Sequence, residues 1–316
     1  MSRIKSPVLI IVLCLILDIA LAAGLVTLTY YGTTLGKCKF RSLNIPTASI
    51  SQRINFSSTY GTHFSKSVST TAHSYRSPNV SVEVSSHGIG SGSDRITYEV
   101  ADVFISNMKC IKTIFGGKTY GIGYLEHITS MSRRSKAILA INGDSYCYNR
   151  KHLNGLLVRN GTVYRSARSS GDVCVLYKTG RMAIYSPADF SASKCIKDGA
   201  LDTWVFGPSL LTADGHSKSV FTHTWNYIRD PHSRTAIGYY APGHYCFVTV
   251  DKKSGVSAGM PLSMLSKIFE GLGCKSAYNL DGGHMSFMAF RGKVVNTPLE
   301  YDKKIPDSIC ICDVSG

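Results

Sequence analysis

Two turn pairs near the middle of the chain, Asn160-Gly161 and Thr179-Gly180, each lie between short runs in which apolar and polar residues alternate. The runs read LLVRNGTVYR and VCVLYKTGRMAIY. Asparagine and glycine accept the positive φ angles of tight hairpin turns, and alternation is typical of a strand with one buried face. Both stretches therefore predict β-hairpins, which commits this region to antiparallel sheet.

The same alternation recurs in other parts of the chain. ITYEVADVFIS begins at Ile96, and TAIGYYAPGHYCFVTV, FMAFRGKVVN and DSICICDV follow later. Helical patterns are fewer: SMSRRSKAILAING suggests a short helix before a strand, and PLSMLSKIFEGLGC is amphipathic, with Pro261 near its start and Gly271 or Gly273 past its end. A strand-rich domain with a few packed helices is an α+β fold, and we expect it over residues 96–316.

The N-terminal part has a different composition. Residues 8–28 read VLIIVLCLILDIALAAGLVTL, with Asp18 as their charged residue. A membrane span needs about 20 apolar residues, and one central aspartate costs about 3 kcal/mol, which the Leu, Ile and Val residues offset. We predict a single-pass anchor over residues 1–36, while an A-x-A site at residues 20–22 leaves a cleaved signal peptide open. Either interpretation places the rest of the chain outside the cytoplasm, where the Ser- and Thr-rich residues 37–95 suggest a loosely ordered stalk.

The formal charge of +15 indicates attraction to polyanions, such as phosphate-bearing polymers of the cell surface or anionic lipid. No arginine-rich run or aromatic-basic repeat accompanies that charge, so we expect no nucleic-acid partner. Solvated lysines are the simpler alternative explanation of the charge.

The ten cysteines are scattered, without C-x-x-C or a Cys/His cluster of metal-site spacing. Disulfides in an oxidising compartment would explain such scattering, and free buried thiols are the alternative. We predict no cofactor and no metal among the site residues, although scattered acids could hold a structural Ca²⁺.

Three stretches, AILAINGDSY, SRTAIGYY and NLDGGHMSFM, occur in this order and are linked by GLLVRNGTVYR and FGPSLLTADG. Together they resemble the phosphodiester glycosidase family from about Tyr98 to the C-terminus. The resemblance implies a mixed α+β domain whose motif loops converge on one pocket. It also implies hydrolysis of a sugar-1-phosphodiester, which releases the sugar and leaves a phosphomonoester on the other partner.

The resemblance assigns catalytic roles to two residues. A third candidate follows the strand 137–141, at a position where many relatives have a second glycine. Arg234, from the R-T-A motif, offers a planar bidentate grip on phosphate oxygens. Asp281, from the D-G-G motif, suits an acid, a base or a nucleophile, since glycoside cleavage commonly uses two carboxylates. Asp144 is the second carboxylate, although a phosphate leaving group needs less protonation than an alcohol and one carboxylate can suffice. Without the family, a surface arginine and a structural Asp-Gly turn would be the ordinary interpretations.

Further residues of the motifs are candidates for substrate binding: Asn142, Gly143, Gly282, Gly283, His284 and Ser286. The asparagine could bond the sugar or the phosphate, or support a turn. The two glycines of D-G-G could offer backbone N–H groups to an oxyanion, or only shape the turn. Where many relatives read D-G-G-G-S, this chain has His284 and Met285 before the serine, and the histidine could donate a proton or bind phosphate.

These observations predict an extracytoplasmic hydrolase that cleaves a glycosyl phosphodiester in cell-envelope or extracellular polysaccharide. One alternative is a cell-surface protein that grips a glycan or an anionic polymer without turnover. Another is a structural protein of the surface, in which the anchor and stalk would be the main features.

Overall fold

A computed structural model describes residues 37–49, 54–146, 155–222 and 224–314. The largest element is a seven-stranded antiparallel sheet. Its strands, in spatial order, are β19 (Ser276–Asn279), β15 (Arg234–Ala241), β16 (His244–Val250), β6 (Ile96–Ile105), β5 (Val80–Ile89), β4 (Ser74–Arg76) and β3 (Ser69–Thr70).

A second antiparallel sheet has five strands. Their spatial order is β21 (Lys293–Val294), β20 (Met288–Phe290), β9 (Ala137–Asn142), β22 (Asp307–Cys312) and β7 (Ile111–Phe115). Four helices are described: α2 (Ser57–Tyr60), α3 (Ile128–Ser135), α4 (Ala192–Lys197) and α5 (Leu262–Gly271).

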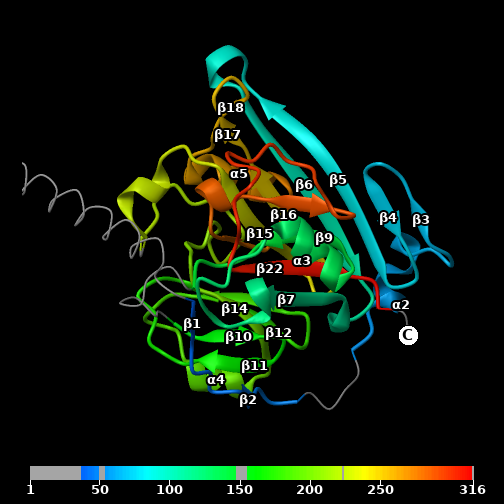
Figure 1. The fold of residues 1–316 in the computed structure, drawn as a ribbon, viewed down its shortest axis with the longest axis vertical. Helices are drawn as coiled ribbons and strands as arrows, with labels where there is room; N and C mark the ends of the chain where they lie inside the picture. Colours follow the sequence, from blue (N-terminus) through cyan, green and yellow to red (C-terminus); the bar gives the residue numbers. More distant parts are fainter. Residues whose placement is uncertain (1–36, 50–53, 147–154, 223, 315–316) are drawn as a thin grey trace, which may run out of the picture.

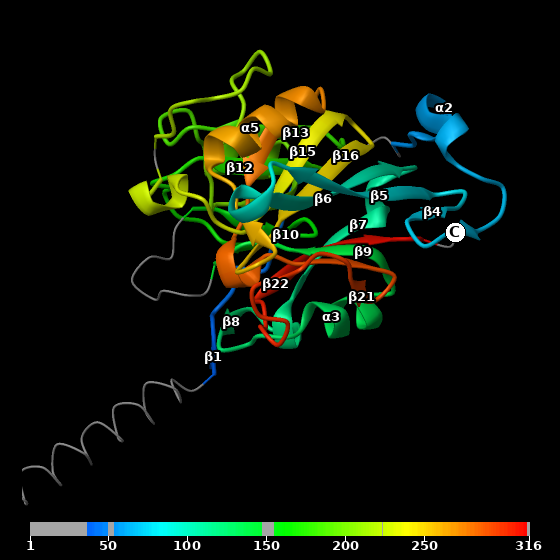
Figure 2. The ribbon, with the colours of Figure 1, turned by 90° about the horizontal axis from the view of Figure 1, so that it is seen from above.

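The two large sheets pack face to face between helices (Figures 1 and 2). The central core joins Val82 of β5 and Val103 of β6 to Leu139 of β9 and Ile309 of β22. On the outer face of the seven-stranded sheet α5 buries its apolar side, and on the outer face of the five-stranded sheet α3 does the same. The layers therefore run α5, large sheet, small sheet, α3, as Figure 2 shows from above.

A lobe of shorter strands lies beside this sandwich, around a core of its own (Figure 1). It holds β13 (Met182–Tyr185), β12 (Val173–Tyr177) and β14 (Ala200–Trp204) in one sheet, and β10 (Leu157–Arg159), β11 (Thr162–Arg165) and β2 (Ile45–Pro46) in another. Two short pairs complete the strands: β1 (Cys38–Lys39) with β8 (Gly121–Ile122), and β17 (Lys252–Lys253) with β18 (Ser257–Ala258). Single 3-10 turns connect many elements: η1 (Gly61–His63), η2 (Gly92–Asp94), η3 (Met108–Cys110), η4 (Gly116–Lys118), η6 (Asn226–Arg229) and η7 (Gly283–Met285).

The local predictions are confirmed where the sequence signal was strongest. Asn160 and Gly161 both have positive φ, 51° and 77°, and turn β10 into β11. Leu176 pairs with Met182 around the second turn, so β12 and β13 form the other expected hairpin. The strand-rich architecture with few helices agrees with the predicted α+β class.

The structure departs from the expected stalk over residues 37–95. All ten residues of β5 pair with β6, and Val80, Val82 and Val84 are buried in the central core. Glu83 and residues 85–88 are exposed on this strand, which lies between β6 and β4 in the sheet, so the compact domain begins well before Ile96. The predicted anchor over residues 1–36 lies outside the described residues, and no helix among those described is long and apolar enough to cross a membrane.

The described cysteines are free thiols, and all but Cys38 are buried. This is the second of the two alternatives left by the sequence, because the expected disulfides are absent from the described residues. The Sγ atoms of Cys246 and Cys274 approach to 3.5 Å inside the α5 side of the core.

Candidate active site

The end of β9 and the start of β22 bring two acidic residues together. Ser308 pairs with Asn142, so the residues after β9 run beside Asp307. The Asp144 N–H donates to Asp307 Oδ1 at 2.7 Å, and the Gly143 N–H donates to the Asp307 carbonyl at 3.1 Å. A Cβ at Gly143 would lie 2.5 Å from Asp307 Oδ1, which explains why glycine occupies this position.

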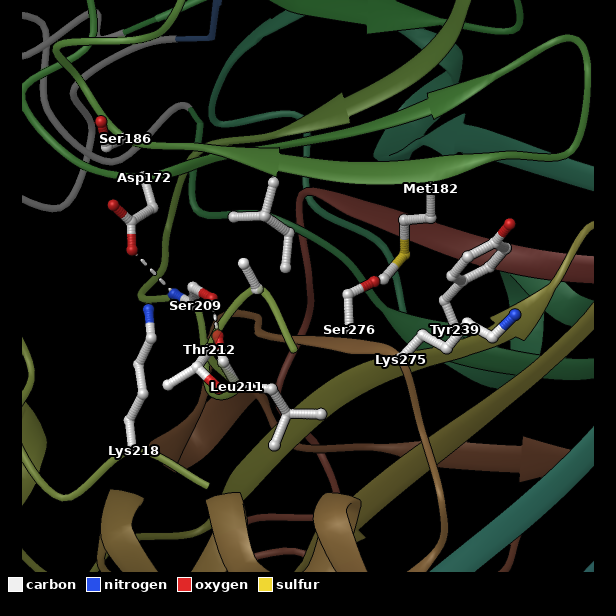
Figure 3. Close-up of a pocket in the computed structure, with 12 residues that line it drawn as sticks. Asp172, Met182, Ser186, Ser209, Leu211, Thr212, Lys218, Tyr239, Lys275 and Ser276 are labelled. Atoms are coloured by element: carbon white, nitrogen blue, oxygen red, sulfur yellow. Dashed lines mark hydrogen bonds between the residues drawn. The ribbon is translucent and has the colours of Figure 1, made fainter. Parts of the chain in front are cut away.

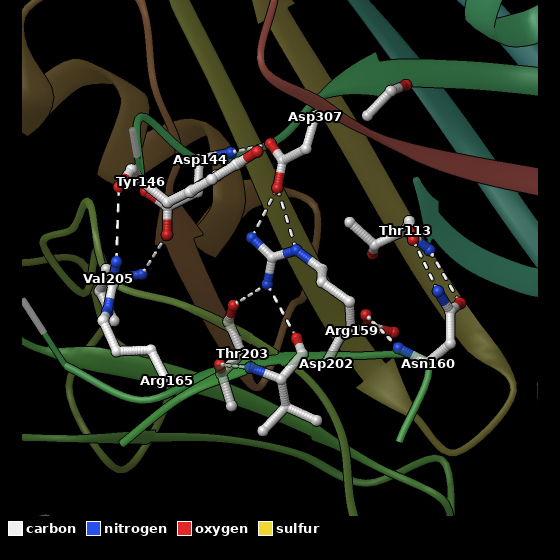
Figure 4. A network of polar contacts seen from close by, with 12 residues as sticks. Thr113, Asp144, Tyr146, Arg159, Asn160, Arg165, Asp202, Thr203, Val205 and Asp307 are labelled. Atoms are coloured by element: carbon white, nitrogen blue, oxygen red, sulfur yellow. Dashed lines mark hydrogen bonds and ion pairs between the residues drawn. The ribbon is translucent and has the colours of Figure 1, made fainter. Parts of the chain in front are cut away.

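Asp307 forms a buried ion pair with Arg159 of β10 (Figure 4). The Arg159 Nη2 and Nε atoms donate to Asp307 Oδ2 at 2.6 and 3.0 Å. Nη1 donates to the carbonyls of Val158, at 2.9 Å, and Thr203. Both charged side chains are at most 1% exposed, so the pair ties the lobe of shorter strands to the five-stranded sheet without contact with water.

Asp281 reaches the same place from the end of β19. Its N–H donates to the Gly143 carbonyl at 3.2 Å, and its carbonyl accepts from Asn142 Nδ2 at 2.8 Å. The Asn142 Oδ1 accepts from Thr235 Oγ1 at 2.6 Å and from the Phe287 N–H at 3.0 Å. Both ends of the Asn142 amide are therefore engaged inside the protein, where they join the A-I-N-G and D-G-G motifs.

The side chains of Asp144 and Asp281 each keep one unpaired oxygen. Asp144 Oδ2 accepts the Val205 N–H at 2.6 Å, and Asp281 Oδ1 accepts the Gly282 N–H at 2.9 Å. Asp144 Oδ1 and Asp281 Oδ2 are buried and have no hydrogen-bond partner among the described residues. Burying a carboxylate oxygen without a partner costs free energy, so two such atoms in one site mark a place prepared for a ligand or a proton.

The surroundings separate the two carboxyl groups in acidity. Burial, reinforced by the charge of Asp144, raises the pKa of Asp281 to about 8. Burial also raises the pKa of Asp144, but the positive charges of Arg159 and Arg165 oppose that rise. A pKa of about 8 leaves Asp281 mostly protonated at neutral pH, whereas Arg159 and Arg165 favour the charged form of Asp144.

Arg234 begins β15 and is 3% exposed. Its Nε donates to the Met260 carbonyl at 2.9 Å, and its Nη2 donates to the carbonyls of Ile228, at 2.5 Å, and Asp230. Its Nη1 makes no hydrogen bond and its charge no ion pair among the described residues. Burial lowers the pKa of Arg234 to about 10, against the opposing charge of Asp230. The side chain supports η6 through the Ile228 and Asp230 carbonyls, and the hydrogen bonds it donates do not reach the two carboxyl groups.

The D-G-G loop uses its backbone N–H groups within the protein. Gly282 donates to Asp281, and Gly283 donates to the Ser233 carbonyl at 3.0 Å. A Cβ at Gly282 would lie 2.8 Å from that carbonyl, so close backbone packing accounts for this glycine. The predicted N–H cradle for an oxyanion is therefore already occupied by protein acceptors. His284 Nδ1 lies 2.7 Å from Glu300 Oε1, and both side chains are half-exposed.

Ser286 is buried at 1% exposure, and its Oγ has no hydrogen-bond partner among the described residues. The Ser286 carbonyl accepts from Asn296 Nδ2 at 3.1 Å. The Oγ atom of Ser233 is also buried and unpaired within the described part of the chain. Ser286 follows the D-G-G loop in sequence, and Ser233 accepts a hydrogen bond from Gly283 through its carbonyl. Both unpaired hydroxyl groups therefore belong to the surroundings of Asp281.

The sequence analysis missed Asp307 and Arg159. Asp307 is the first residue of the stretch DSICIC, whose sequence predicts a strand and indicates no role for the acid. Arg159 precedes the Asn160-Gly161 turn, where an exposed basic residue is common. The available signal was an acid at the start of a mostly apolar strand, which resembles the position of Asp144 shortly after β9. Their partnership could not be seen locally, because the two residues are 148 positions apart.

Two buried carboxyl groups in one candidate site, with Arg159 and Arg165 beside Asp144, are groups that can take part in proton transfer. The chain belongs to the phosphodiester glycosidase family, whose sequence model matches residues 135–312. This match confirms the resemblance drawn from the three motifs.

Other proteins are similar to this chain in sequence or in fold. The chain is 30% identical over 181 residues to the SPbeta prophage-derived uncharacterized protein YomE of Bacillus subtilis strain 168, covering 56% of this chain and 28% of that protein. The fold resembles the zebrafish N-acetylglucosamine-1-phosphodiester alpha-N-acetylglucosaminidase catalytic domain auto-inhibited by pro-peptide, with a TM-score of 0.60, 18% identity, and coverage of 86% of this chain and 98% of that one. A hypothetical protein from Synechocystis shares it at a TM-score of 0.50 and 14% identity, over 78% of this chain and 64% of that one. At these identities the two structures support the fold alone.

Proposed function

We propose that this protein is an extracytoplasmic hydrolase that cleaves a sugar-1-phosphodiester within a phosphate-bearing glycan of the cell envelope or extracellular matrix. The proposal rests on the family, and the observation that carries it is the pair of buried, unpaired oxygens on Asp144 and Asp281. The location outside the cytoplasm rests on the apolar residues 8–28. The basic charge of the chain suits an anionic polymer.

Asp281 is the proposed general acid. It donates its proton to the phosphate oxygen as the bond between that oxygen and C1 of the sugar breaks. Asp144 either accepts a proton from the water that attacks C1 or attacks C1 itself, in which case water later releases the sugar. Either route consumes one water molecule and yields the free sugar and a phosphomonoester.

Arg234 is the proposed partner of the phosphodiester charge. The charge of Asp230 offsets part of the cost of burying the Arg234 guanidinium, and an anionic ligand would offset more of it. The carbonyls of Met260, Ile228 and Asp230 accept hydrogen bonds from Nε and Nη2 of Arg234. The two N–H groups of Nη1 therefore remain for the phosphate oxygens. Because Arg234 also supports η6, its replacement would disturb both the loop and the ligand, so it is a poor first variant.

The assay that tests the function compares two substrates of the purified full chain: a GlcNAc-1-phosphodiester and a p-nitrophenyl glycoside of the same sugar. We expect release of sugar from the phosphodiester only, since the buried cation favours a phosphate group. Equal turnover of both would remove the phosphate requirement. If a folded chain turned over no phosphodiester across several sugars but still bound a phosphoglycan, the non-catalytic glycan-binding alternative would replace the proposal.

The pH dependence follows from the raised pKa of Asp281. The acid form is present below about pH 8 and is lost as pH rises through that value. We therefore expect kcat/KM to fall about tenfold per pH unit above about pH 8, as the protonated fraction falls. A pH–rate profile from pH 5 to 10 measures this limb, and a rate that keeps rising above pH 8 would contradict an acid role for Asp281.

A further inference from the structure

Two exposed aromatic side chains lie at the start of the 3-10 turn η6, one just before the turn and one within it. The turn stands at the left periphery, in yellow, in Figures 1 and 2. Trp225 and Tyr227 are each 60% exposed. Their ring centroids lie 6.0 Å apart and the ring planes differ by 7°, so the rings are nearly parallel. We propose that Trp225 and Tyr227 form a stacking platform for a sugar unit of the glycan chain next to the bond that is cleaved. The proposal rests on the function proposed above and specifies its substrate as a polymer.

The turn is held firmly although its rings are exposed. His232 Nε2 donates to the Tyr227 carbonyl at 2.8 Å, and Arg234 donates to the Ile228 carbonyl. Ile228 itself is 4% exposed and packs into the core beneath α5, and Arg229 Nη2 donates to the Phe221 carbonyl at 2.7 Å. A large ring left in water forgoes about 2 kcal/mol of burial free energy, so a rigid turn that presents two rings is a feature expected of a binding surface.

The platform is linked to the candidate active site through a short connection. From Tyr227 the chain needs six residues to reach Ser233, whose carbonyl accepts the Gly283 N–H beside Asp281. Six residues span at most roughly 20 Å. Lys252 Nζ also donates to the Pro231 carbonyl at 2.7 Å, which fixes the connection midway. A glycan bound at Asp281 therefore needs only a few sugar units to reach the two rings.

The chemistry of the turn favours a sugar over a bilayer or a protein. The faces of aromatic rings carry partial negative charge and attract the C–H groups on one face of a sugar ring. Asn226, Arg229 and Asp230 are exposed beside the rings and offer the amide, guanidinium and carboxylate groups that bond sugar hydroxyls. A surface that enters a bilayer would instead carry a broad apolar face without such polar groups.

The test is the double substitution Trp225→Ala/Tyr227→Ala in the full chain, assayed on two substrates. One is a polysaccharide with phosphodiester-linked sugars, and the other is a methyl phosphodiester of the single sugar. We expect KM for the polymer to rise about tenfold, the loss given by one good aromatic contact, while kcat/KM for the small substrate stays within about twofold. Trp225→Phe/Tyr227→Phe should restore most of the polymer affinity.

Tyr301→Ala is the matched control, since Tyr301 is 58% exposed and its ring lies under Lys253 instead of beside a second aromatic ring. An unchanged KM for the polymer in the double variant would overturn the platform while leaving the hydrolase intact. Equal losses on both substrates would also overturn it, because they would show collapse of the turn. If the wild type turned over neither substrate, the proposed hydrolase would fail. Co-sedimentation with the polymer would then test the platform separately, and weaker binding by the double variant than by the wild type would support it. Loss of binding to anionic phospholipid vesicles with unchanged polymer binding would reassign the rings to a membrane.

Discussion

Replacing Asp281 with asparagine is expected to lower kcat on a sugar-1-phosphodiester by about 10²–10⁴-fold, the range that a general acid contributes. Asparagine has nearly the same shape, and its carbonyl oxygen can still accept the Gly282 N–H. What it lacks is a proton that can be transferred to the leaving oxygen. We expect KM to change little, because the variant keeps the size and neutrality of the protonated acid.

The stability of this variant separates a catalytic role from a structural one. With a pKa of about 8, Asp281 is mostly protonated in the folded protein at pH 7 but ionised in the unfolded chain, so folding takes up a proton at that pH. An amide titrates in neither state, so Asp281→Asn should raise the free energy of unfolding at pH 7. Urea unfolding of the wild type and of Asp281→Asn at pH 7 measures this. Asp198→Asn, at a partly exposed acid paired with Lys194, is the matched control for activity. Retention of full kcat in Asp281→Asn would remove Asp281 from the mechanism, and a loss of stability comparable to the loss of rate would make its role structural.

The elements that the sequence predicted correctly are those whose signal is local. The Asn160-Gly161 turn needs only two residues with positive φ, and α5 needs only a Pro261 start and an apolar face. The strand β5 was missed because its exposed residues are Ser, Glu and His, which resemble a polar linker when the neighbouring strand β6 is unknown. The pairing of β5 with β6 is what shows that one face of β5 is buried.

The candidate site shows the same division between local and distant information. The motifs named Asp144 and Asp281 as candidates, and the structure shows the backbone hydrogen bonds that join their loops through Gly143 and Asn142. The motifs could not show that the Asn142 amide is hydrogen-bonded within the protein or that Arg234 supports η6. Those contacts depend on how the chain folds and not on the motif itself. Residue type and motif position therefore indicate which residues belong to the candidate site, but they do not predict the contacts that each side chain makes.

The largest expected effect on stability comes from the ion pair of Arg159 with Asp307. Replacing Arg159 with methionine fills similar space but leaves the Asp307 carboxyl group buried without its cation, and breaking a buried pair in this way costs about 3–5 kcal/mol. Burial already raises the pKa of Asp307 to about 6 in the presence of Arg159, which lowers it. Without Arg159 the pKa of Asp307 rises further, so the folded variant binds more protons than the unfolded chain over a wider pH range.

The destabilisation should therefore depend on pH. Stability falls with rising pH wherever the folded state binds more protons than the unfolded state, so the deficit of Arg159→Met is expected to be smaller at pH 5 than at pH 8. Urea unfolding at both values measures it. The double variant Arg159→Met/Asp307→Asn carries no buried charge at these two positions, and its amide oxygen can still accept the Asp144 N–H. We expect the double variant to be more stable at pH 8 than Arg159→Met alone. Such a result would show that the two positions are energetically coupled, which independent distant sites are not. Strictly additive losses with no pH dependence would mean that the pair contributes packing only, and that its charges do not hold the lobe of shorter strands against the five-stranded sheet.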